Sequence, residues 1–78
     1  MKLVLVEWLD AITAHSGWKD IDEVRKNKPP LVKSVGWVVS KSPNHITLCA
    51  SIVGKDVDGD VTVPMGMVRK ITELCPRK

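Results

Sequence analysis

Asp10, His15 and Ser16 lie within seven residues of one another and are the three residue types of a hydrolase triad. In such a triad the histidine removes the serine proton while the carboxylate orients the imidazole. The G-x-S-x-G turn that presents a nucleophilic serine is missing around Ser16. The sequence therefore predicts no catalytic residue. We expect His15 to lie in a loop, and Asp10 to make local hydrogen bonds beside the end of a strand.

Metal chemistry is a second possibility, raised by the acidic segment 56–60 (DVDGD). Its glycine comes one ligand position too early for an EF-hand calcium loop, and the twelfth position is Met67 instead of glutamate. Cys49, Cys75 and the histidines lack the spacing of zinc ligands. We expect an acidic hairpin turn, no metal and no cofactor. Cys49 is predicted to be a small core residue, and both thiols to be reduced in a cytoplasmic protein.

Recognition of phosphate groups is the third possibility. The candidates for contact with nucleic acid are Arg25, Lys26, Lys28, Lys33, Lys41 and His45. They form one phosphate-binding face if the chain turns sharply between a predicted helix and the following strand. The alternative is an ordinary solvated surface, because a net charge of +3 is only mildly basic.

The elements that position these groups are mostly strands. Valine and isoleucine make up half of the hydrophobic residues, and branching at Cβ favours strands. Strands are expected over 2–9, 31–40, 46–53, 61–63 and 67–74, with helix as an open alternative for the last. Both faces of 2–9 are apolar, which predicts a strand covered on two sides. Gly36, inside a strand, predicts a bulge, a bend or a close backbone approach.

One helix of about two turns is expected between Asp20 and the pair Pro29-Pro30. Asp20 is suited to cap its first turn, and the prolines forbid its continuation. A helix this short is not stable alone, so Ile21 and Val24 are expected to dock on the sheet.

These elements predict a single mainly β domain over 1–78, with a frayed tail at 75–78. Closure hides strand edges, so we expect a small five-stranded, partly open barrel with one short helix after the first strand. The tight turn 64–66 before the last strand favours an Sm-like or Src-homology-like barrel. Most of the three tryptophans are expected in its core. No apolar run is long enough for a membrane span, and the N-terminus does not have the pattern of a secretion signal.

Val63, Val68 and Ile71 are spaced as in the second motif of the Sm-like family, which the chain resembles. This resemblance implies a homo-oligomeric ring that binds single-stranded RNA, with His45 as a stacking residue. The chain departs from the motif where Pro64-Met65 replaces the Arg-Gly pair that helps that family hold RNA.

Four patterns spread over residues 6–74 also resemble a group of short phage-encoded proteins. The patterns are Trp8/Asp10, Gly17-Trp18, Val35-Gly36-Trp37, and the hairpin 63–68 followed by Ile71 and Leu74. The resemblance implies a phage or prophage origin and action in the host cytoplasm.

The sequence thus favours a non-enzymatic binding module. The first hypothesis is a phage accessory protein that binds and modulates a host protein, with the adaptable side chains of Met65 and Met67 in the contact. The alternative is an Sm-like homo-oligomer that binds RNA.

Overall fold

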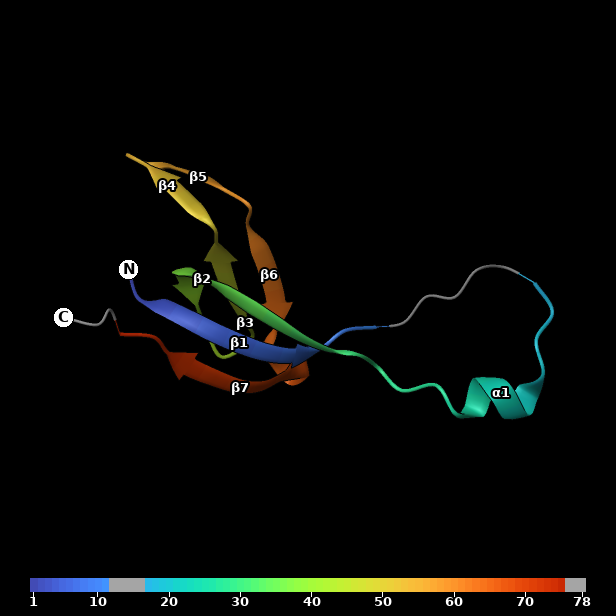
Figure 1. Cartoon of the computed structure of the whole chain (residues 1–78). Coiled ribbons are helices and arrows are strands. Elements are labelled where there is room, and N and C mark those ends of the chain that lie inside the picture. Colours follow the sequence, from blue (N-terminus) through green and yellow to red (C-terminus); the bar gives the residue numbers. More distant parts are fainter. Residues whose placement is uncertain (12–16, 76–78) are drawn as a thin grey trace.

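The computed structural model describes residues 1–11 and 17–75 as a curved sheet from which residues 17–30, here called the arm, project (Figure 1). Its elements are β1 (Leu3–Leu9), α1 (Ile21–Arg25), β2 (Leu31–Lys41), β3 (His45–Cys49), β4 (Ser51–Val53), β5 (Asp56–Asp58), β6 (Val61–Pro64), the 3-10 turn η1 (Met65–Met67) and β7 (Val68–Glu73). A mainly β domain with one short helix after the first strand is therefore confirmed. The predicted fraying at 76–78 lies outside the described residues.

The main sheet has five antiparallel strands in the order β6-β3-β2-β1-β7. Its edges, β6 and β7, are joined by η1 but do not pair with each other, so the sheet is not closed into a barrel. Pro64 ends β6 without an N–H to donate, and η1 turns the chain so that β7 pairs with β1. Of the two alternatives for residues 67–74, the strand is correct for Val68–Glu73.

A second, smaller sheet pairs β4 with β5, and this hairpin bends away from the main sheet (Figure 1). The predicted single strand 46–53 is therefore broken at Ala50, whose N–H bonds to the carbonyl of Asp58 at 3.0 Å. Asp56–Asp58 is a strand, not the predicted acidic turn. Because the hairpin leaves the core, Ala50 and Ile52 are exposed, whereas Ile46 and Leu48 of β3 are buried.

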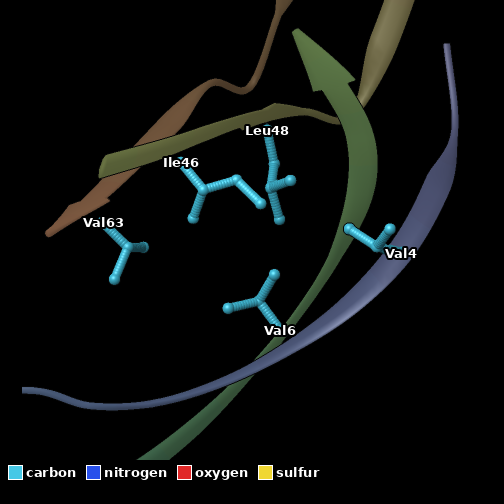
Figure 2. Packing of buried hydrophobic residues seen from close by; sticks show 5 residues of the cluster. All are labelled: Val4, Val6, Ile46, Leu48 and Val63. Atoms are coloured by element: carbon cyan, nitrogen blue, oxygen red, sulfur yellow. The ribbon is translucent and has the colours of Figure 1, made fainter. Parts of the chain in front are cut away.

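The hydrophobic core lies on the concave face of the sheet, where side chains of β1, β3 and β6 point toward one another (Figure 2). Its five buried members are Val4, Val6, Ile46, Leu48 and Val63. Alternate residues of a strand point to opposite faces, so the even-numbered residues of β1 supply this face. The odd-numbered ones point to the other side.

Two features tie β2 to its neighbours. A Cβ on Gly36 would lie 2.7 Å from the carbonyl oxygen of Cys49, which confirms the predicted close backbone approach. Trp8 packs against the core and donates its indole N–H to Ser34 Oγ at 3.1 Å. Trp8 is the single tryptophan that packs there, because Trp18 and Trp37 are exposed. The expectation that the core holds most of the tryptophans is wrong.

The arm leaves the sheet at the paired ends of β1 and β2. Leu9 is in register with Leu31, and the N–H of Asp10 bonds to the carbonyl of Pro30 at 3.1 Å. Pro29-Pro30 favours extended backbone before β2, which carries the arm past the end of the sheet. The helix α1 consequently lies away from the sheet (Figure 1) and has no buried residue, so the predicted docking of Ile21 and Val24 is wrong.

Candidate binding surfaces

The six candidate nucleic-acid contacts lie in three separate places. Arg25, Lys26 and Lys28 are on the arm, in or just after α1. Lys33 is an exposed residue of β2 beside the arm, whereas Lys41 ends the same strand. Eight residues of strand span roughly 26 Å. The structure therefore does not bring the six onto one face.

Lys41 and His45 flank the turn between β2 and β3. Ser42 organises this turn, because its Oγ accepts hydrogen bonds from the backbone N–H groups of Asn44 and His45, both at 3.2 Å. The N–H of Ser42 bonds in turn to the carbonyl of His45 at 2.9 Å. The His45 ring lies 3.4 Å from Ser42 Oγ, measured at Nδ1. Lys41 is in register with Ile46 and shares its side of the sheet, so the adjacent His45 points to the opposite side.

A pocket of about 470 Å³ opens at this same end of the concave face. Apolar side chains of the core form its floor, and its charged residues are Lys2, Lys41 and Glu73. The ammonium of Lys2 lies 3.5 Å from a carboxylate oxygen of Glu73. This arrangement is able to hold a small group that has one apolar side and one anionic side.

The two methionines suggested as a partner contact lie at either end of η1 and do not form one patch. Met65 packs against the core, and its N–H bonds to the carbonyl of Asn44 at 2.9 Å. Met67 is exposed. Of the pair, Met67 is the side chain available to a partner.

The arm exposes apolar side chains that sequence reasoning assigned to a packed interface. Trp18 is fully exposed, and Ile21 and Val24 are exposed as well. Asp20 caps α1 by accepting the N–H of Asp22 at 3.0 Å, and Asp22 pairs with Arg25 at 3.6 Å. The signal that the helix projects was the proline pair that follows it, which holds the chain extended.

A second apolar surface covers the side of the sheet opposite the core. We call it the outer face; it is formed by the odd-numbered residues 3–9 of β1 and 31–37 of β2, with adjoining residues of β7. Leu31 is 51% exposed, Val35 59% and Trp37 37%. The odd-numbered residues of β1 on this face are only half-buried, so the predicted cover on both sides of the first strand is incomplete within this chain. The apolar pattern that prompted it is nevertheless present.

Among residues 1–11 and 17–75, no three His, Cys, Asp or Glu side chains gather as a metal site requires. Asp10 accepts the N–H of Ala11 at 2.9 Å, the local bond predicted for it, whereas His15 and Ser16 lie outside the described residues. Cys49 is buried as predicted, Cys75 is exposed, and both are free thiols. No helix in the described part of the chain is long and apolar enough to cross a membrane.

Comparisons with protein-family models, with curated proteins and with solved structures found no match to this chain.

Proposed function

We propose that this protein is a non-enzymatic protein-binding module and that its arm contacts the partner. The full exposure of Trp18, beside a helix with no buried residue, carries this proposal. Tryptophan is enriched among the few residues that dominate interface energies, because a partner pocket can bury its large ring. Ile21 and Val24 are further exposed apolar side chains of the arm. Burial against a partner also supplies the packing that a five-residue helix needs to persist.

The charge of the arm indicates the chemistry of the partner. Asp20, Asp22 and Glu23 flank Ile21, whereas Arg25, Lys26 and Lys28 follow Val24. An apolar groove with basic groups at one end and acidic groups at the other is therefore complementary to the arm. The resemblance to short phage-encoded proteins supports a phage accessory role, in which that groove belongs to a host protein in the host cytoplasm. Met67, which is exposed in η1, is a second candidate for contact with the partner.

The experiment compares proteins retained from host lysate by three immobilised forms of the chain, with quantitative mass spectrometry. The arm variant is Trp18→Ser with Ile21→Ser. Its control is Val53→Ser, which removes an exposed apolar side chain from the β4–β5 hairpin. A partner of the arm is retained by wild type and control, and lost by the arm variant.

The retained protein is then purified and titrated against each form by calorimetry. We expect the arm variant to bind about tenfold more weakly or worse, and Met67→Ser to show whether η1 contributes. Equal affinity of the arm variant and the control contradicts the assignment of the arm.

An Sm-like RNA-binding protein is the alternative. The strand order, with a 3-10 turn between the two edge strands, supports a relation to Sm-like or Src-homology-like folds. Three basic residues close together on the arm support contact with phosphates. The test is fluorescence anisotropy with labelled oligouridine at several salt concentrations, where the log–log slope is about −0.7 per phosphate contact. Absence of binding at low salt, or binding indifferent to salt, removes this alternative.

A further inference from the structure

The outer face combines exposed apolar side chains with a row of charges in a regular register. Across β2 and β1, Trp37 lies beside Leu3, Val35 beside Leu5, and Leu31 beside Leu9. The remaining row is charged: Glu7 lies between Lys33 on β2 and Lys70 on β7. The ion pairs formed within the described residues are Lys2–Glu73 and Arg25–Asp22, so this row is not engaged in one.

From this pattern we infer that two copies of the chain associate through their outer faces, related by a two-fold axis. Such an interface must be self-complementary, because each residue meets a different residue of an identical patch. The face fulfils this condition: it holds both an acidic and a basic member in adjacent strands, and it has an apolar residue beside each apolar residue.

The register specifies the axis. A two-fold axis parallel to the strands and midway between β1 and β2 places β1 of one copy over β2 of the other. Glu7 then faces the partner's Lys33, and Leu5 faces the partner's Val35. Sheets packed in this way lie about 10 Å apart, close enough for their side chains to interdigitate.

A hollow of about 340 Å³ at one end of the face fits the same arrangement. Leu3, Trp37 and Leu74 contribute to its lining. The axis brings the partner's Trp37 over Leu3, so each copy inserts an indole ring into the hollow of the other. Tryptophan in a pocket near the partner's apolar residues is a typical interface anchor.

The two-fold axis also fixes how the two arms are placed in the dimer, whatever the function of the arm. Both copies of β1 run in the same direction along the axis, and each arm follows the end of its β1. The dimer therefore projects two arms from one end, which is suited to bivalent binding.

The first test is the mass in solution, measured by multi-angle light scattering over about a hundredfold range of concentration. We expect a species of twice the 8.6 kDa chain mass. Val35→Lys places a charge at the centre of the face and is expected to weaken association by about tenfold or more. Val53→Lys, on the hairpin, is the matched control and stays dimeric. A monomeric wild type, a larger assembly, or a Val35→Lys variant as dimeric as the control overturns the inference.

The second test exploits the charged row and does not depend on a loss of signal. Glu7→Lys and Lys33→Glu each place like charges opposite one another in the homodimer, so each variant alone is expected to be monomeric. Mixed together, they restore two opposite-charge contacts, and native mass spectrometry should detect the heterodimer. Circular dichroism of each variant verifies folding before mixing. Two folded variants that stay monomeric when mixed, or that each dimerise like wild type, overturn the proposed pairing.

Discussion

The sheet and the arm contain the same types of apolar side chain, but the sheet buries them and the arm exposes them. Trp8 packs against the core and bonds to Ser34, whereas Trp18 is fully exposed. Ile46 is completely buried in β3, whereas Ile21 is exposed in α1. The difference arises from connectivity, since strands held in register converge on one concave face while the proline-ended arm is carried past it. Stability should therefore depend on the sheet, and partner recognition on the arm.

The largest expected effect comes from truncating matched isoleucines in the two regions. Ile46→Ala removes atoms from the enclosed core and should lower the free energy of unfolding by about 3 kcal/mol. Ile21→Ala removes the same atoms from an exposed position and should change the free energy of unfolding by less than about 0.5 kcal/mol. Urea denaturation followed by circular dichroism measures both. Similar losses for the two variants mean that the arm packs against the sheet.

A glycine pair gives the next largest effect. The Cβ of Gly36→Ala meets the backbone oxygen of Cys49 at 2.7 Å, and backbone cannot move aside cheaply. We expect a loss of about 2 kcal/mol in urea denaturation. Gly66→Ala in η1 is the control, because nothing lies within 4 Å of its Cβ position. If Gly36→Ala is as stable as Gly66→Ala, β2 and β3 are farther apart in solution than described.

The tryptophans give a smaller effect that separates a hydrogen bond from simple burial. Trp8→Phe loses the indole donor to Ser34 and should cost about 1–2 kcal/mol. Trp18→Phe should be nearly neutral in thermal denaturation, while exposed Trp18 should account for most of the iodide quenching of wild-type fluorescence. Unchanged quenching in Trp18→Phe would place that ring in a packed site.

The contrast also explains which parts of the molecule the sequence predicts. The apolar run over 2–9 and the glycine at position 36 are local features of the sequence. The strand β1 and the close approach of β2 to β3 follow from them. Barrel closure and the bend at Ala50 depend on how distant segments meet. The sequence predicts the candidate sites least well. The basic residues are close in sequence, but they are distributed over the arm and an 11-residue strand, which separates them in space.

The smallest expected effect comes from the N-cap of α1. Asp20 accepts the N–H of Asp22, and Asp20→Ala removes that acceptor. Cap removal costs a helix about 1 kcal/mol locally. Because α1 has no buried residue, this local cost should leave global unfolding in urea within about 0.5 kcal/mol of wild type. The helical Cα chemical shifts of residues 21–25 should nevertheless decrease. The two measurements together decide whether α1 folds independently of the sheet. Smaller helical Cα shifts with unchanged stability in urea mean that it does. A parallel decrease in both means that the helix and the sheet fold as one cooperative unit.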